Sequence, residues 1–281
     1  MLKLVKEALA LDLPLATTRI KRFIKDYMEK TKAKGIVIGL SGGIDSSTTA
    51  AVTSLAIGGD KISALNISEE ENYNTTDIRH AKIVAKKFRF KLETIDISPI
   101  LKAYYKTLPI YDEDDKLSRG NIKARTRMVC LYYYANHLGK IVCGSSDKSE
   151  TMIGYFTKWG DVAADISPLM DLYKTQVRQL AAYIGLPKEI IAKPPSPQLW
   201  PGQTAENELG VKYEALDLIL LGLENFMSPE DIAQQLELPT KLVQNIKDMW
   251  LAREHKRRLP LTIKLQYRTV GADFRLPYTR S

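Results

Sequence analysis

Hydrophobic residues follow two different spacings in the first part of the chain. Between residues 16 and 33 they recur every three or four positions, as on one face of an amphipathic helix. The run GIVIGL at 35–40 is continuous and rich in branched side chains, which is typical of a strand buried on both faces. After the motif SGGIDSS, an Ala- and Thr-rich segment predicts a helix that reaches about Ile57. The pattern therefore begins as helix, strand, helix.

The same alternation continues further along the chain. It predicts strands at 61–67, 91–97 and 140–145, and helices at 75–88, 121–138 and about 177–184. The last of these helices is expected to end at Gly185-Leu186-Pro187. Strands that alternate with helices indicate an α/β fold with a doubly wound, mostly parallel sheet flanked by helices. Ligands of such sheets bind at the carboxyl ends of the strands, near the switch in strand order.

The pattern changes after residue 192. The stretch 193–210 contains KPPSPQLWPGQ and is predicted to be a loop. Helical periodicity returns at 211–225, 228–236 and 239–254, whereas 255–281 has none and is interpreted as a tail that orders over the active site. We expect one domain over 1–281, with an α/β core at about 16–192 and a helical C-terminal portion and tail at about 193–281.

Composition narrows the choice of partner. The 281 residues include 41 Lys and Arg against 33 Asp and Glu, a net charge of +8 that suits an anionic ligand. The basic residues are dispersed, with one dense cluster at 253–258, which favours a nucleotide over a nucleic acid. Cys130 and Cys143 fit no metal or redox spacing, and no apolar run reaches the roughly 18 residues of a membrane span. We expect a cytoplasmic protein that binds neither nucleic acid nor membrane.

The motif SGGIDSS lies between the first predicted strand and the helix that follows it. Gly42 and Gly43 permit a tight turn and a close approach of the backbone to a ligand. Amide groups at the start of a helix attract an anion, and the serines add hydroxyl donors. No Gly-Lys-Ser/Thr follows, so this is not a Walker A loop. The predicted ATP-binding residues of this loop are Gly39, Leu40, Ser41, Gly42, Gly43, Ile44, Asp45 and Ser46.

Asp45 introduces a negative charge into this anion-binding loop. Repulsion between its carboxylate and a phosphate is costly unless a cation lies between them, so Asp45 is a candidate Mg²⁺ ligand. The alternative is that Asp45 serves only as a helix cap.

The loop resembles the pyrophosphate loop of the ATP pyrophosphatase superfamily, whose members cleave ATP between the α and β phosphates to form adenylates. Within that superfamily the chain is similar to the NAD synthetase family from about residue 16 to 260. The segments that carry the resemblance are GNIKARTRM (120–128), GSSDKSE (144–150), FTKWGDVAADISPL (156–169), TAENELGVKYEALD (204–217) and EHKRR (254–258).

The resemblance implies further residues that bind ATP and metal. Ser145, Lys174 and Ser196 match positions that contact ATP in the family, and Lys174 is also expected to act as a catalytic cation. Glu150 matches a second Mg²⁺ ligand beside Asp45. Without the resemblance, Glu150 would be interpreted as an exposed residue of a helix.

The resemblance also implies a site for deamido-NAD (nicotinate adenine dinucleotide). Asp161 matches the acid that receives ammonium and is expected to be catalytic, because a carboxylate can bind the cation and help it lose a proton. Local alternatives are a turn at Gly160-Asp161, a solvated basic face at 123–127 and a basic helix end at 255–258. The residues expected to bind the dinucleotide are Arg125, Lys158, Asp165, His255 and Lys256.

The resemblance implies an ammonia-dependent ligase. It would activate deamido-NAD with ATP as an acyl-adenylate and release NAD, AMP and pyrophosphate, with Mg²⁺ as cofactor and a homodimer as the assembly. We expect no glutaminase domain, because it would need on the order of 200 more residues and no cysteine has a nucleophile context. Two rival interpretations are a tRNA-modifying member of the superfamily and a non-catalytic nucleotide-binding sensor.

Overall fold

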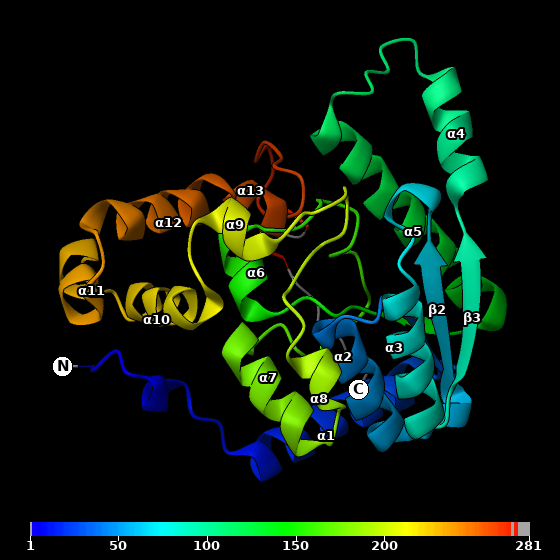
Figure 1. The fold of residues 1–281 in the computed structure, drawn as a ribbon, viewed down its shortest axis with the longest axis horizontal. Coiled ribbons are helices and arrows are strands. Elements are labelled where there is room, and N and C mark those ends of the chain that lie inside the picture. Colours follow the sequence, from blue (N-terminus) through cyan, green and yellow to red (C-terminus); the bar gives the residue numbers. More distant parts are fainter. Residues whose placement is uncertain (1, 271–272, 275–281) are drawn as a thin grey trace.

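A four-stranded parallel sheet organises the computed structural model, which describes residues 2–270 and 273–274 (Figure 1). The strands are β1 (Ile36–Gly39), β2 (Ile62–Ser68), β3 (Lys91–Asp96) and β4 (Ile141–Cys143), in the order β3-β2-β1-β4. All neighbouring strands are parallel, with Ile36 of β1 beside Ile62 of β2 on one side and Ile141 of β4 on the other. The predicted α/β fold with a parallel sheet is confirmed.

Helices cover both faces of this sheet. On one face, Val37 of β1 and Val142 of β4 pack with Ala135 of α5, whereas Ile36 and Ile38 belong to the larger core on the other face. The α2 helix contacts β1 and β2, and α1 and α7 lie against α2. The helices of this part are α1 (Leu13–Thr31), α2 (Ile44–Ile57), α3 (Thr75–Lys87), α4 (Ser98–Thr107), α5 (Lys116–Leu138), α6 (Lys148–Ile153), α7 (Lys174–Tyr183) and α8 (Lys188–Ile191), with 3-10 turns η1 (Lys6–Leu9), η2 (Gly59–Lys61) and η3 (Glu70–Asn72).

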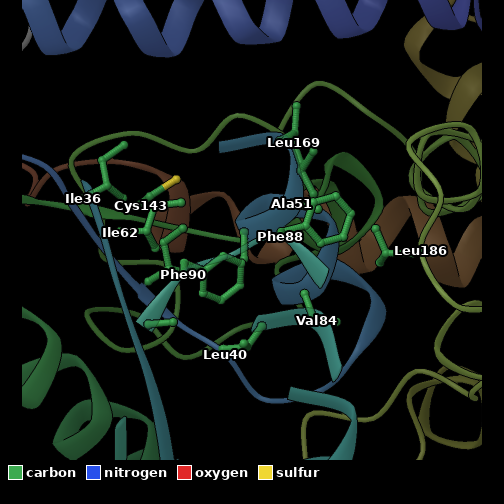
Figure 2. Packing of buried hydrophobic residues seen from close by; sticks show 14 of the residues in the cluster. Ile36, Leu40, Ala51, Ile62, Val84, Phe88, Phe90, Cys143, Leu169 and Leu186 are labelled. Carbon is green, nitrogen blue, oxygen red and sulfur yellow. The ribbon is translucent and has the colours of Figure 1, made fainter. Parts of the chain in front are cut away.

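The larger core explains why these segments adopt their structure. Figure 2 shows Ile36 and Ile62 beside Cys143 of β4, and Ala51 of α2 beside Phe88 in another part of the same buried cluster. Small residues on α2 let this helix approach the sheet closely. Burial of such apolar side chains contributes about 25 cal/mol per Å² and supplies most of the driving force for this packing.

The C-terminal helices form a second core. They are α9 (Ala205–Leu209), α10 (Tyr213–Glu224), α11 (Pro229–Leu236), α12 (Thr240–Ala252) and α13 (Glu254–Arg257). Leu220, Ile232 and Val243 are buried between α10, α11 and α12, together with Leu9 of η1 and Ile153 of α6. The short helix α6 thus joins the sheet part to the helical part.

The structure differs from the predicted elements in several places. α4 and α6 were not predicted, and α5 begins five residues earlier than expected because Asp115 caps it by accepting a hydrogen bond from the Ser118 N–H at 2.9 Å. The predicted loop at 193–210 contains α9, so that prediction is wrong for 205–209, and α13 covers the start of the predicted tail. Residues 271–272 and 275–281 of that tail lie outside the described residues.

The strand order creates a switch point beside β1. The chain leaves β1 for β2 and β3 on one side, and returns to place β4 on the other side. The segments that follow β1 and β4 therefore meet at the carboxyl edge of the sheet, where doubly wound folds bind ligands. Within the described ranges, no helix combines the length and apolar character required to cross a membrane.

Candidate active site

The turn after β1 has a conformation that depends on glycine. Gly42 has φ +85°, and a Cβ at this position would lie 2.3 Å from the backbone oxygen of Asp77. Serines brace the turn from within: the Gly43 N–H donates to Ser41 Oγ at 3.2 Å, and the Ser41 N–H donates to Ser46 Oγ at 3.2 Å. The motif SGGIDSS therefore forms a pre-shaped turn at the N-terminus of α2, as expected of an anion-binding loop.

A pocket opens over this turn at the carboxyl edge of the sheet. Residues following β1, β2 and β4 line it, together with residues from α5 and the proline-rich segment 193–199. Several predicted site residues from distant parts of the sequence converge here. They are Gly39, Leu40, Ser41, Gly43, Ile44, Asp45, Ser46, Ser145, Glu150, Asp161 and Ser196.

Lys174 lies at the centre of a cluster of acidic side chains. Its Nζ is 2.7 Å from Asp45 Oδ2, 2.8 Å from Asp147 Oδ2 and 2.9 Å from Glu150 Oε1. The side chains of Lys174 and Asp147 are completely buried, whereas those of Asp45 and Glu150 remain about one-fifth exposed, at 21% and 22%. Lys174 is absent from the pocket lining and contacts it through Asp45 and Glu150.

The acidic groups of this cluster outnumber its single ammonium group, and the charges within it shift the pKa values of Asp147, Glu150 and Lys174. Burial raises the pKa values of Asp147 and Glu150, and the charge of Asp45 adds to both rises, while Lys174 lowers both. The charge of Asp147 raises the pKa of Glu150 further. Burial alone would lower the pKa of Lys174, but the three carboxylates outweigh it and hold that pKa well above its usual value. Asp45 Oδ1 is buried and has no hydrogen-bond partner. One ammonium among three carboxyl groups leaves excess negative charge, which favours a further cation.

Asp147 was not predicted as a site residue. Besides its ion pair with Lys174, its Oδ1 accepts a hydrogen bond from the Glu150 N–H at 2.8 Å and so caps α6. The signal was present in the sequence, because Asp147 followed by Glu150 three residues later is a helix-start pattern. The complete burial of Asp147 depends on α7 and α10, which no local pattern reveals.

Asp161 lines the same pocket as the turn after β1. Its Oδ1 accepts a hydrogen bond from the Thr157 N–H at 2.7 Å, which closes the turn that the local pattern suggested. Asp161 has accessible surface and lines the pocket, but the surrounding protein raises its pKa by desolvation. The hydrogen bond and the charges of Lys256 and Arg127 oppose this rise without cancelling it.

The residues expected to bind the dinucleotide lie outside the pocket lining. The Arg125 guanidinium donates to the Lys158 backbone oxygen at 3.2 Å from an exposed position on α5. Lys256 Nζ donates to the backbone oxygens of Gly154 and Phe156 at 2.9 and 2.7 Å, and His255 is exposed. Arg125 and Lys256 thus contact the backbone of segment 154–161, which carries Lys158 and Asp161.

Asp165 has a structural partner. Its Oδ2 accepts a hydrogen bond from the Val142 N–H of edge strand β4 at 2.7 Å. This contact holds the segment after β4 against the sheet edge.

The proline-rich segment 193–204 closes another side of the pocket. Lys193 and Gln198 both bind the carboxylate of Asp77, and Lys123 Nζ donates to the Leu199 backbone oxygen at 2.9 Å. Ser196 Oγ donates to the Gln203 backbone oxygen at 2.6 Å. The segment is therefore tied to α3 and α5. A solvated basic face at 123–127 does not hold for Lys123, which is buried and pairs with Glu69 and Glu71.

Comparisons with known proteins agree with this geometry. The NAD synthase family model matches residues 16–260. The NH(3)-dependent NAD(+) synthetase of Methanocaldococcus jannaschii is 47% identical over 245 residues, which cover 87% of this chain and 94% of that protein.

Two solved structures share the fold. The structure of the NMN synthetase of Francisella tularensis matches with a TM-score of 0.80 and a sequence identity of 32%. The NH3-dependent NAD synthetase of Campylobacter jejuni, solved with the nitrate ion, matches with a TM-score of 0.76 and a sequence identity of 27%. Each alignment covers 91% of this chain and 100% of the other. With a family model that spans most of its length and a curated relative at 47% identity, the chain belongs to the NAD synthase family.

Proposed function

We propose that this chain converts deamido-NAD to NAD with ammonia as the nitrogen donor and ATP as the activating co-substrate. The observation that carries the proposal is the cluster of Lys174, Asp45 and Glu150 directly beside the turn after β1. A cation and carboxylates at an anion-binding turn suit chemistry at a phosphate. Curated relatives at similar coverage carry the name NH(3)-dependent NAD(+) synthetase.

The first step of the proposed reaction is adenylation. ATP binds with its triphosphate at residues 41–47 and its remaining parts against Ser145 and Ser196. A carboxylate oxygen of the nicotinate group attacks the α-phosphorus, the bond to the β-phosphate oxygen breaks, and pyrophosphate leaves. Lys174 supplies a fixed positive charge next to Asp45 and Glu150, so this step depends on positioning and electrostatics.

The acidic residues fit a magnesium ion. Asp45 and Glu150 would hold it, since Mg²⁺ is usually bound by one or two carboxylates together with phosphate oxygens and water. The buried Asp45 Oδ1 has no hydrogen-bond partner and supplies a free oxygen ligand. When bound, the ion would offset negative charge on the phosphates. Phosphate oxygens of ATP and water molecules would complete the coordination of this ion.

The second step is attack by ammonia. Asp161 lies in the pocket and binds ammonium, accepts one of its protons and leaves ammonia free to attack the acyl carbon. The bond from that carbon to the adenylate oxygen breaks, AMP leaves with this oxygen, the nitrogen loses a second proton to solvent, and the amide remains on NAD. The proline-rich segment 193–204 excludes water from the adenylate.

We further propose that the protein is a homodimer that uses the outer face of α5. Val129 and Tyr133 lie four residues apart on α5 and are 56% and 68% exposed. Arg125 lies on the same stripe, so a second copy at this face would also border the proposed dinucleotide site. Val129→Glu should produce monomers in sedimentation velocity, and an unchanged dimer would contradict the use of this face.

We propose that residues 1–281 form one domain with two cores and that the protein is cytoplasmic. Cys130 and Cys143 are free thiols, as expected in a reducing compartment.

Nicotinate mononucleotide is a second candidate substrate beside deamido-NAD, because one of the similar structures is that of an NMN synthetase. Formation of NMN by the same chemistry would require nicotinate mononucleotide in place of deamido-NAD. The purified protein should be supplied with ATP, Mg²⁺, ammonium and either acceptor, and AMP, NAD and NMN should be measured. We expect a much higher kcat/KM with deamido-NAD.

Two further arms of this experiment separate the rival functions. AMP release driven by tRNA would indicate a tRNA-modifying enzyme, and ATP binding without turnover would indicate a sensor. Glutamine should not replace ammonium. Preference for the mononucleotide, for tRNA or for glutamine would each contradict the proposal.

A further inference from the structure

The start of α7 depends on groups from other helices. Lys174 is the first residue of α7, and the first N–H groups of any helix need acceptors from outside it. The Lys174 N–H donates to Ser149 Oγ of α6 at 2.9 Å, and the Thr175 N–H donates to Asp217 Oδ2 of α10 at 2.8 Å. The backbone that carries Lys174 is therefore fixed from both sides.

The two acceptors are connected. Ser149 Oγ donates to Asp217 Oδ1 at 2.5 Å, so a single carboxylate holds the Thr175 amide directly and the Lys174 amide through the serine. Asp217 and Ser149 are both completely buried. Ser149 also precedes Glu150, so the same contact restrains the α6 turn that bears one of the acidic partners of Lys174.

A second residue on the same face of α10 touches the cluster itself. Tyr213 lies one turn before Asp217 and is completely buried. Its hydroxyl donates to Glu150 Oε1 at 3.4 Å, and its ring centre lies 5.2 Å from Lys174 Nζ, within cation–π range. One helix from the C-terminal portion thus contacts the charged end of Lys174 directly and holds its backbone amide through Ser149.

We propose that Asp217 is a positioning residue that holds Lys174 and Glu150 in register with the turn after β1. Asp217 is absent from the pocket lining and touches no group that would contact substrate, so it acts only through Ser149, Thr175 and the backbone of α7. The kinetic test of this inference rests on the proposed function, whereas its structural test by NMR does not.

Three variants test the inference. Asp217→Ala removes both hydrogen bonds, Asp217→Asn keeps one acceptor oxygen for the Thr175 amide, and Ser149→Ala removes only the link to the Lys174 amide. The matched control is Glu214→Gln: Glu214 is exposed and pairs with Arg178, so it joins the same two helices at the surface without reaching Lys174.

We expect the Asp217 variants to lower kcat and leave KM for ATP and deamido-NAD within about threefold of wild type. Asp217→Ala should lose about 10- to 100-fold, the range seen when a group that orients a functional ligand is removed. Asp217→Asn should recover part of the loss, and Glu214→Gln should match wild type. If folded Asp217→Asn and Ser149→Ala both keep wild-type kcat, the inference is overturned, whether or not Asp217→Ala folds.

A readout without substrate separates this inference from the proposed reaction. Protein labelled with ¹³C at the lysine ε-carbon gives a Lys174 resonance, assigned by its loss in Lys174→Met. Its shift should move in Asp217→Asn and Ser149→Ala, and stay unchanged in Glu214→Gln. An unmoved resonance in both folded variants would overturn the positioning role, whereas absence of NAD formation by wild type would overturn the proposed function alone.

Discussion

Asp45 and Lys174 meet at 2.7 Å although 129 residues separate them in the sequence. The turn after β1 carries the first, and the start of α7 carries the second. Their contact joins the predicted phosphate loop to a buried acidic cluster, which gives the pocket a charged wall next to the expected triphosphate.

Lys174→Met should abolish turnover and also destabilise the protein. The substitution leaves three carboxyl groups close together without their cation, and breaking a buried ion pair costs about 3–5 kcal/mol. Urea unfolding should show this loss, and kcat should fall by about 100-fold or more. Lys148→Met, which removes a pairing with Glu224 away from the pocket, is the control. Wild-type stability in Lys174→Met would show that the cluster is not organised around this lysine.

Asp45→Asn should abolish turnover while the fold remains intact. The amide keeps the shape of the side chain but loses the charge expected to hold Mg²⁺ beside the phosphates. Calorimetric titration should show that Mg²⁺ no longer strengthens ATP binding, and circular dichroism should match wild type. Full activity in this variant would remove the proposed metal role.

Asp161→Asn should affect ammonium much more than ATP. Loss of the carboxylate removes the group that binds ammonium and accepts its proton, a contribution of about 100-fold or more in such steps. KM for ammonium should rise strongly, with the ATP dissociation constant within about threefold of wild type. An unchanged dependence on ammonium would argue against this role.

The pH dependence of ammonium use should report Asp161. Desolvation raises its pKa above the ordinary 3.8, and only the ionised form can bind the cation. Activity at subsaturating ammonium should therefore be retained above the raised pKa and lost as the pH falls through it. The acidic limb should begin at a higher pH than an ordinary aspartate would give, and Asp161→Asn should lack it. The same limb in both proteins would assign it to another group.

Gly42→Ala should distort the turn, whereas Gly43→Ala should not. Gly42 has φ +85° and its new Cβ would meet the Asp77 oxygen at 2.3 Å, while Gly43 has φ −80° and meets only Ser41 Oγ at 3.3 Å. The positive φ alone costs about 1–2 kcal/mol. The melting temperature and the affinity for ATP should both fall in Gly42→Ala. Equal behaviour of the two variants would contradict the required conformation.

The sequence predicts the parts of this protein that have local signatures. GIVIGL followed by SGGIDSS predicts a buried strand, a glycine-containing turn and a helix, and the structure has β1 and α2 on either side of such a turn. The parallel sheet follows from the repeated alternation of strand and helix. The convergence of Asp45, Ser145 and Glu150 on one pocket follows from their places after β1 and β4.

Other parts depend on contacts that no local pattern contains. The complete burial of Lys174 and Asp147 arises because α6, α7 and α10 pack together, and each helix is unremarkable by itself. The acceptor role of Asp217 requires the start of α7 to lie beside α10, although 42 residues separate Asp217 from Thr175. The short helix α6 has too few residues for a periodic signal.

In the proposed reaction, the carboxylate of deamido-NAD becomes an adenylate in this pocket. Deamido-NAD labelled with ¹⁸O in both carboxylate oxygens tests it directly when the purified protein turns over with ATP and ammonium. One ¹⁸O should appear in AMP and one should remain in the amide of NAD, because the attacking oxygen leaves with the α-phosphate. AMP without ¹⁸O, or ADP in place of AMP, would contradict the account.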